Sequence, residues 1–471
     1  MVAFWRIPMP LLAVLMPAVL VTVVASDMVT LMLPAMAAGF GASEAEIAWV
    51  VTGYLLAFSV GIPVYGRVAD RVPLRRLFTV ALAGYVVGNV VCALAPTLPV
   101  LVAGRILTGA GAAALPVLSV VAITRLLPEH RRGTGIGLVS AASGIGAAAG
   151  PALGGVVGQY LGWPALFWLM AASALVLLPL AARALTGQTP PGDATRFDLL
   201  GGVFLGGGAG LALFGMTQAQ VAGFAARASW VSLLAAAVLL ALFAWRTVRA
   251  AEPFAPPELF ANRAYRATVL IALLAMVVNL GGLVLVPLLV VEVNGLDPGV
   301  GALVMIPAGI AVAVLSPAIG RLTDRWGTRS LVVTGLGLMA LAGLCLSTLT
   351  GGASVVPAGA GVLLLAVGFI LVITPIIGAA AGTLPPERVG VGLGLVQGAQ
   401  FLGAGAGPAL FGALVSARRQ SDAAAVNPLH SGADGAAYSD AFLAMAAIAV
   451  LTTALAYRLA GGAPGSRSRP A

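Results

Sequence analysis

Two ionisable residues lie inside apolar stretches of the sequence, where a charge is costly. Asp27 is the only acid well inside such a stretch, and Arg105 is the only base within one. A charged side chain at the centre of a bilayer costs about 2.5–3.5 kcal/mol on insertion scales, so we expect a functional role. A carboxyl group held away from water favours its protonated form, so Asp27 is a candidate proton carrier. The alternative is a structural carboxyl group that is satisfied by hydrogen bonds.

The positions of these two residues permit an ion pair. The helix that contains Asp27 is expected to run outward and to end near Pro34, and the helix that contains Arg105 is expected to run inward. At a rise of about 1.5 Å per residue, both residues then lie about 10 Å below the outer surface. An ion pair would offset part of the cost of burying both charges. Alternatively, Arg105 extends to the membrane surface or bonds only to main-chain carbonyl groups.

The composition is typical of a helical membrane protein. Of the 471 residues, 60% are hydrophobic and 9% are charged, against about 25% charged in soluble domains. These values exclude a soluble enzyme and a disordered chain. All 25 basic residues are Arg, so the sequence contains no Gly-x-x-x-x-Gly-Lys phosphate-binding loop and ATP-driven transport by this chain is excluded.

Fourteen apolar stretches are long enough to cross a membrane as helices, which takes about 20 residues. Because lipid offers no hydrogen-bond partner to the backbone, we predict an all-α polytopic membrane fold. The short connections make neighbouring helices antiparallel. The stretches are 11–34, 47–66, 77–96, 99–125, 133–160, 164–183, 198–219, 229–248, 267–291, 299–320, 330–350, 356–382, 389–416 and 440–460.

The distribution of Arg residues indicates the orientation of these helices. With both termini inside, the inner segments hold 21 Arg residues and the outer loops hold Arg227, Arg418 and Arg419. Positive residues favour the cytoplasmic side, so we expect cytoplasmic termini and a multi-pass protein of the inner (plasma) membrane. Membrane topology also explains the net charge of +9 without nucleic acid as a partner.

Internal repeats divide the chain into two similar halves. Residues 66–76 recur at 320–330, and residues 133–155 align without gaps to 390–412 with 14 identities in 23 positions. We therefore predict two six-helix bundles with two inserted helices between them. The expected domains are 1–185, 186–265 and 266–471. Parallel six-helix repeats with a site at their interface are typical of secondary transporters.

Three motifs resemble those of the major facilitator superfamily, and specifically its drug:proton antiporters with fourteen helices. They are the loop at 66–76, Arg105 followed by Gly109 and Gly111, and Gly150–Pro151 followed by Gly154–Gly155. The resemblance implies a proton-coupled exporter of hydrophobic drug-like or antibiotic-like molecules, which works by alternating access. It implies proton coupling by Asp27 and Arg105. The alternative is an importer or uniporter of a nutrient or lipid with the same fold.

Polar residues within helices are candidates for the substrate cavity. We expect Asp27, Tyr54, Asn279, Gln397 and Gln400 to line it. The competing interpretation of these side chains is hydrogen bonding between helices. The apolar stretches contain no cluster of His, Glu and Asp that would bind a metal or form a catalytic triad. We therefore expect no enzyme activity, no metal and no cofactor, and a monomer whose partners are a small-molecule substrate, protons and lipid.

A second group of residues is expected to form a conformational switch at the cytoplasmic face. Asp70 and Asp324 are each predicted to approach the start of the repeat helix in the other half, where a helix N-terminus favours a carboxylate. The alternative is a solvated turn. Glycines four residues apart, from Gly146 to Gly158, predict either a sliding surface between the halves or ordinary close packing. The predicted switch residues are Asp70, Arg71, Arg75, Gly150, Pro151, Asp324, Arg325 and Arg388.

Overall fold

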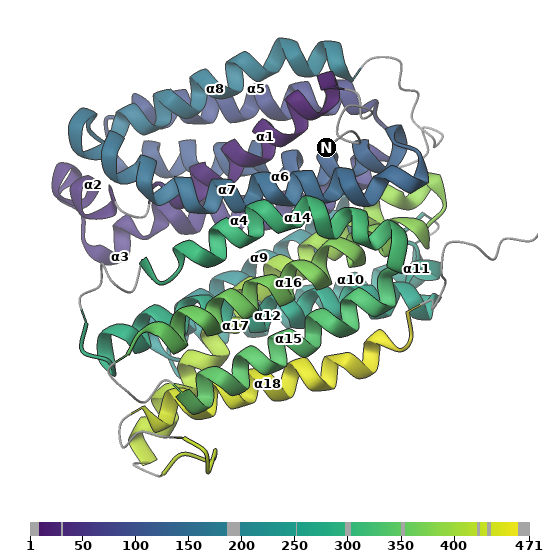
Figure 1. The fold of residues 1–471 in the computed structure, drawn as a ribbon. Helices are drawn as coiled ribbons and strands as arrows, with labels where there is room; N and C mark the ends of the chain where they lie inside the picture. Colours follow the sequence, from purple (N-terminus) through teal and green to yellow (C-terminus); the bar gives the residue numbers. More distant parts are fainter. Residues whose placement is uncertain are drawn as a thin grey trace, which may run out of the picture. The chain divides into compact units, whose positions relative to one another are not determined.

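The structure is a computed structural model that describes residues 9–29, 32–185, 198–250, 252–296, 303–349, 354–421, 424–430 and 435–459. Within these residues the regular elements are all helices, and no strand occurs (Figure 1). The predicted all-α fold is confirmed.

The described residues contain fourteen helices of 19 to 33 residues, as many as the sequence predicts. Twelve of them are long and apolar enough to cross a membrane, and α1 adds a shorter apolar helix. The long helices are α1 (Met9–Asp27), α4 (Trp49–Ala69), α5 (Leu74–Ala93), α6 (Leu98–Leu126), α7 (Glu129–Leu161), α8 (Trp163–Ala184), α9 (Leu199–Ala222), α10 (Arg227–Arg249), α12 (Arg263–Glu292), α14 (Ile306–Trp326), α15 (Thr328–Leu349), α16 (Val356–Gly382), α17 (Val389–Ser421) and α18 (Ala436–Ala456). The short ones are α2 (Leu33–Phe40), α3 (Glu44–Ile47), α11 (Pro257–Ala261) and the 3-10 helix η3 (Pro386–Arg388).

One helix boundary differs in a way that affects the site. The sequence predicts a first helix over 11–34 that ends at Pro34, whereas α1 ends at Asp27 and Pro34 lies in the first turn of α2. Proline is favoured at the start of a helix, because its missing N–H would have no partner there. The prediction that Asp27 lies well inside a helix is therefore wrong: Asp27 is the last residue of α1.

The helices group into two compact units. Unit 1 comprises Met1–Leu211, Ala236–Pro257 and Leu384–Gly398, and unit 2 comprises Ala212–Ala235, Glu258–Thr383 and Ala399–Ala471. In unit 1, α6 packs against α4 and α5, α8 packs against α5, and α1 packs against α6, α7 and α8. Figure 1 shows α5 and α8 side by side. The predicted domain boundaries at 185 and 265 stay a prediction.

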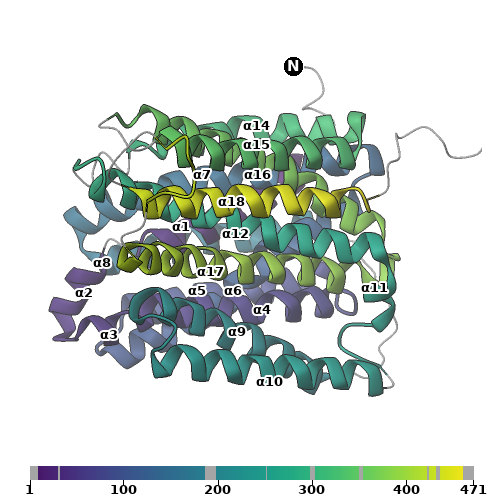
Figure 2. The same ribbon diagram turned by 90° about the horizontal axis from the view of Figure 1, so that it is seen from below.

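Unit 2 repeats the helix pairs of unit 1. There α16 packs against α14 and α15, α18 packs against α15, and α12 packs against α16 and α18. Figure 2 shows α18 beside α15. If α12, α14, α15, α16 and α18 correspond to α1, α4, α5, α6 and α8, the same pairs recur in both units. The repeated sequence thus corresponds to repeated packing.

Glycines permit the closest of these pairs. A Cβ added to Gly88 of α5 would lie 2.5 Å from the Thr108 backbone nitrogen of α6, and one on Gly111 of α6 would lie 2.6 Å from the Tyr85 backbone nitrogen. In unit 2, a Cβ on Gly335 of α15 would lie 2.6 Å from the main-chain oxygen of α16 at position 368. Backbone-to-backbone contact of this kind is typical of membrane helices, where dispersion replaces the hydrophobic effect.

Candidate functional site

Arg105 on α6 is fully buried in unit 1. Its Nε donates a hydrogen bond to the Val50 carbonyl (3.0 Å), and its Nη1 donates to the Ala25 carbonyl (3.4 Å). The guanidinium carbon lies 4.2 Å from the centre of the Tyr54 ring, a cation–π arrangement. Among the described residues, Nη2 has no hydrogen-bond partner. Burial excludes extension to the surface, and the observed acceptors are main-chain carbonyl groups of α1 and α4.

Neutral polar groups of α1, α4 and α5 lie in the same part of unit 1 as Arg105. The Tyr54 hydroxyl donates to the Thr22 carbonyl (3.2 Å), and Asn89 Nδ2 donates to the Tyr85 carbonyl (2.8 Å). The Asn89 Oδ1 atom has no hydrogen-bond partner in the described structure. A buried cation with an unpaired donor attracts an anionic group, because each unsatisfied charged N–H in a low dielectric is costly.

Asp27 ends α1, but its side chain lies outside the described part of the structure. Its backbone is two residues beyond Ala25, whose carbonyl accepts a hydrogen bond from Arg105. The end of α1 thus approaches the buried guanidinium. The ion pair between Asp27 and Arg105 stays a prediction.

The other predicted cavity residues fall into both units. The ring of Tyr54 stacks against the guanidinium of Arg105. Asn279 on α12 is buried, and its Oδ1 atom has no hydrogen-bond partner in the described structure. The Nε2 atom of Gln400 on α17 also has no hydrogen-bond partner among the described residues. Asn279 and Gln400 both belong to unit 2. Gln397 is buried on α17 and belongs to unit 1. Unpaired buried amides suit hydrogen bonding to a ligand.

Asp70 follows α4 and holds the N-terminus of α17. Asp70 is 2% exposed, its Oδ1 accepts from the Gly390 N–H (2.8 Å) and its Oδ2 accepts from the Val391 N–H (2.9 Å). Arg125 Nη2 lies 2.6 Å from Oδ1. Burial raises the pKa of Asp70 from 3.8 to about 6, although the hydrogen bond from Val391, the charge of Arg125 and the hydrogen bond from Gly390 act in the opposite direction. The N–H groups of a first helical turn lack partners within the helix, so the carboxylate caps them.

The predicted approach of Asp70 to the start of the repeat helix is therefore present in unit 1, although its partner Arg is Arg125 and not Arg388. Gly66 allows this approach, since a Cβ there would lie 2.9 Å from the Gly394 Cα. The role of the contact as a switch stays a prediction.

Of the remaining predicted switch residues, Arg71 and Arg388 lie close enough to Arg67, near Asp70, to act on it electrostatically. Arg71 pairs with Glu252 (3.5 Å), and the Arg75 side chain is exposed. Arg388 ends η3 and is half-buried, and Arg325 is exposed at the end of α14. Gly150 is buried on α7. The side chains of Pro151 and Asp324 lie outside the described part of the structure.

The glycine stripe of α7 packs within unit 1. A Cβ on Gly146 would lie 3.0 Å from the carbonyl oxygen of Leu20 on α1, and one on Gly154 would lie 2.9 Å from the Cα of Met28, the residue after α1. In unit 2, a Cβ on Gly403 of α17 would lie 3.1 Å from the Cβ of Met276 on α12. These contacts support the close-packing interpretation of the stripe, and sliding between the halves stays a prediction.

Residues 252–254, a short segment after α10 that we call the latch, are held within unit 1 by contacts that the sequence did not predict. Asp198 accepts from Arg246 Nε (2.6 Å) and from the Phe254 N–H (3.2 Å). Arg67 Nη2 donates to the Pro253 carbonyl (3.3 Å). Burial acts to raise the pKa of Asp198, but the hydrogen bonds that it accepts outweigh burial and hold the pKa below its usual value. Asp198 and Arg246 are 48 residues apart, so no local sequence signal marks this ion pair.

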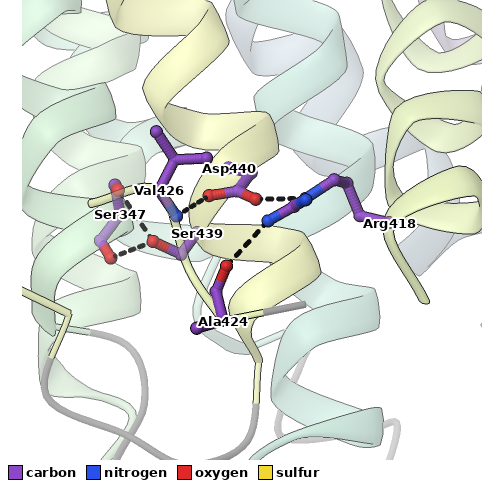
Figure 3. A network of polar contacts seen from close by, with 6 residues as sticks. All are labelled: Ser347, Arg418, Ala424, Val426, Ser439 and Asp440. Carbon is purple, nitrogen blue, oxygen red and sulfur yellow. Dashed lines mark hydrogen bonds and ion pairs between the residues drawn. The ribbon is translucent and has the colours of Figure 1, made fainter. Parts of the chain in front are cut away.

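A polar network joins α15, α17 and α18 of unit 2 to the segment 424–430 (Figure 3). Arg418 pairs with Asp440 and donates to the Ala424 carbonyl (2.8 Å). Asp440 also accepts from the Val426 N–H (2.8 Å). Two further members are Ser347 and Ser439, whose hydroxyl oxygens are 2.9 Å apart. This network fixes the connection that precedes α18, and the sequence analysis treated Arg418 only as a topology signal.

Two units with the same helix pairs, built from helices long and apolar enough to cross a membrane, are typical of one class of protein, the multi-span membrane transporter. The chain belongs to the Major Facilitator Superfamily, whose family model matches residues 15–408. The resemblance seen in the three motifs is thereby confirmed.

Individual relatives agree with this assignment. Over 391 residues the chain is 29% identical to "Multidrug resistance protein Stp" of Mycobacterium tuberculosis, and the aligned region covers 83% of this chain and 72% of the relative. Over 411 residues it is 29% identical to the "Tetracenomycin C resistance and export protein" of Streptomyces glaucescens, with 87% and 76% covered. The crystal structure of the human organic anion transporter MFSD10 shares the fold, with a TM-score of 0.68 at 16% identity and 95% and 99% coverage.

Proposed function

We propose that this transporter exports drug-like or antibiotic-like small molecules in exchange for protons. The relatives named for drug resistance and for antibiotic export support the substrate class. The observation that carries proton exchange is the fully buried Arg105, whose Nη2 atom has no partner in the described structure and whose Nη1 atom reaches the end of α1. The two bundles, 1–185 and 266–471, alternate in access, and the inserted helices lie in 186–265.

Asp27 carries the exchanged proton in this proposal. Protonation neutralises its carboxylate, weakens its attraction to Arg105 and lowers the cost of closing apolar walls around it. When the proton leaves, Arg105 stabilises the anion again. Tyr54, Asn279 and Gln400 bind polar groups of the substrate, supported by the unpaired amide atoms of the latter two. Gln397 completes the cavity.

The Asp70 contact acts as the cytoplasmic part of the switch. Its two hydrogen bonds and its pair with Arg125 stabilise one conformation, and their loss accompanies the change of access. Asp324 and Arg325 provide the equivalent contact in the second repeat. The protein works as a monomer in the inner membrane. Both termini lie in the cytoplasm, which the 21-to-3 distribution of Arg residues supports.

The decisive experiment measures substrate-dependent proton movement in proteoliposomes under an imposed pH gradient. Asp27→Asn fixes the neutral state, so proton exchange should disappear while downhill exchange of substrate remains. The matched control is Glu387→Gln, which removes an exposed acid of η3 and should leave the rate unchanged. If Asp27→Asn exchanges protons at the wild-type rate, Asp27 is not the carrier.

The substrate is identified by a drug-susceptibility panel in a host that lacks its own efflux pumps. Expression of the wild type should raise resistance to a few chemically related compounds, and Asp27→Asn should abolish that gain. No change in resistance to any compound, together with substrate uptake, would support an importer instead.

A further inference from the structure

A groove lies in unit 2, where residues of α12, α17 and α18 meet. It has a volume of about 390 Å³, within the range of roughly 300–1,000 Å³ that is typical of ligand sites. Apolar side chains and a glycine form its wall, and polar side chains form its rim. The lining residues are Leu285, Leu288 and Glu292 of α12, Gly412, Val415, Ser416, Arg419 and Gln420 of α17, and Tyr438 of α18.

The rim carries two opposite charges next to each other. Glu292 and Arg419 form an ion pair, and the Tyr438 hydroxyl donates to Glu292 (2.6 Å) and accepts from Arg419 Nη2 (3.2 Å). The Arg419 and Glu292 side chains are 49% and 41% exposed. Both hydrogen bonds of Arg419 use Nη2, so its Nε and Nη1 atoms can donate to a ligand. The rim is therefore neutral as a whole but offers a cation and an anion side by side.

The length of α12 fits a membrane-spanning helix whose end, together with the rim, lies at the level of the lipid headgroups. α12 has 30 residues and ends at Glu292. At about 1.5 Å per residue it is about 45 Å long, which matches the bilayer including its headgroup regions. The apolar wall, formed by Leu285, Leu288 and Val415, lies one to two turns closer to the hydrocarbon. Leu288 is 45% exposed, so the wall is accessible from outside the unit.

We propose that this groove binds a phospholipid that has a primary amine in its headgroup. The lipid phosphate accepts hydrogen bonds from Arg419, the ammonium group donates to Glu292, and an acyl chain lies along the apolar wall. A headgroup with both charges complements the rim better than an anionic headgroup, because Glu292 repels a second anion close to Arg419.

The glycine in the wall permits a test that leaves the fold intact. A Cβ on Gly412 would meet no atom within 4 Å, so Gly412→Leu fills the groove without displacing the protein. The matched control is Gly337→Leu on α15, where a Cβ also meets nothing within 4 Å. Native mass spectrometry of the delipidated full-length protein measures binding of phosphatidylethanolamine and of phosphatidylglycerol with the same acyl chains. Gly412→Leu should weaken phosphatidylethanolamine binding about tenfold, as expected when roughly two methylene groups of the acyl chain lose their burial, and Gly337→Leu should not.

Substitutions at the rim test the headgroup assignment separately. Glu292→Gln removes the partner of the ammonium group and leaves Arg419 without its anion, so the preference for phosphatidylethanolamine over phosphatidylglycerol should be lost or reversed. Arg419→Gln should weaken the binding of both lipids. Arg227→Gln, which removes an exposed Arg at the start of α10, is the control and should change neither.

Two outcomes would overturn the proposal. One is unchanged phosphatidylethanolamine binding in Gly412→Leu. The other is a ratio between the two lipids that Glu292→Gln leaves at the wild-type value. If instead a drug-like amphiphile binds the wild type, is lost in Gly412→Leu and is not displaced by phosphatidylethanolamine, the groove takes that compound and the lipid assignment is wrong.

Discussion

The contact between Asp70 and the start of α17 should respond to pH, because the carboxyl group is buried there. Its pKa is about 6 when the contact is formed, and 3.8 is the usual value that applies when the carboxyl group is solvated. A group with a raised pKa in the contact binds protons more tightly in that state. The stabilising effect is therefore fully present below about pH 3.8 and is lost as the pH rises through about 6.

The size of the effect follows from these two values. A difference of about two pKa units corresponds to about 3 kcal/mol between fully protonated and fully ionised conditions. Acidification from about pH 7.5 to about pH 5 covers only part of that range and should shift the equilibrium about tenfold toward the capped state. Asp70→Asn removes the titrating group, so this pH dependence should vanish.

Spin-label distances measure this equilibrium. Labels at Arg76→Cys and Glu387→Cys report on the two sides of the contact, since both side chains are exposed in unit 1. The native Cys92 and Cys345, which are free, are replaced by Ala in this background. The fraction with the short distance should rise on acidification, with the change beginning near pH 6 and ending near pH 3.8.

A substitution of the neighbouring acid Glu252 shows whether the pH response belongs to Asp70. Glu252 pairs with Arg71 near the same end of α4, so Glu252→Gln should retain the transition. A wild-type distance distribution that stays constant over this pH range refutes the reasoning, as does a transition in Asp70→Asn equal to that of the wild type.

Three further substitutions test packing and charge. Gly88→Ala should destabilise the protein by about 1–3 kcal/mol, because overpacking separates α5 from the backbone of Thr108. Thermal unfolding measures this loss. The control is Gly84→Ala on the same helix, where a Cβ meets no atom within 4 Å and no effect is expected. Asp198→Asn should lower the unfolding temperature at neutral pH, because it loses charged hydrogen bonds worth about 1–3 kcal/mol. The difference from the wild type should shrink below about pH 4, because a group with a lowered pKa stabilises the fold above its usual pKa. An equal difference at all pH values contradicts this. Arg105→Lys keeps the charge but loses the planar fork that reaches two carbonyl groups, so transport should fall without being abolished, and wild-type transport rates would show that the fork is dispensable.

Helix number and class were predictable because membrane helices are defined by length and polarity alone. The stretch 356–382 coincides with α16. The end of the first helix was not predictable by the same rule, since an apolar run continues through Met28 and Val29 while the backbone turns. Pro34 was interpreted as a helix end, although proline is also favoured in the first turn of a helix.

Parts of the candidate site follow from the sequence for a different reason. Arg105 is conspicuous because a base within an apolar run is costly, and the repeat located the start of α17 as the target of Asp70. The partners were not predictable. Arg105 bonds to main-chain carbonyl groups, which every residue has, and Arg125 is 55 residues from Asp70. Only the folded structure brings these groups together.

The latch connects the segment after α10 to the last turn of α4 and to the loop that follows it. Arg67 donates a hydrogen bond to the Pro253 carbonyl and Arg71 pairs with Glu252, so both arginines contact the segment that follows α10. A chimera that exchanges α9 and α10 with those of another transporter must therefore bring residues 252–254 and Asp198 with them. Without these residues, Arg67 would lose the Pro253 carbonyl and Arg71 would lose Glu252, so the graft would disturb the end of α4, to which it has no direct chain connection.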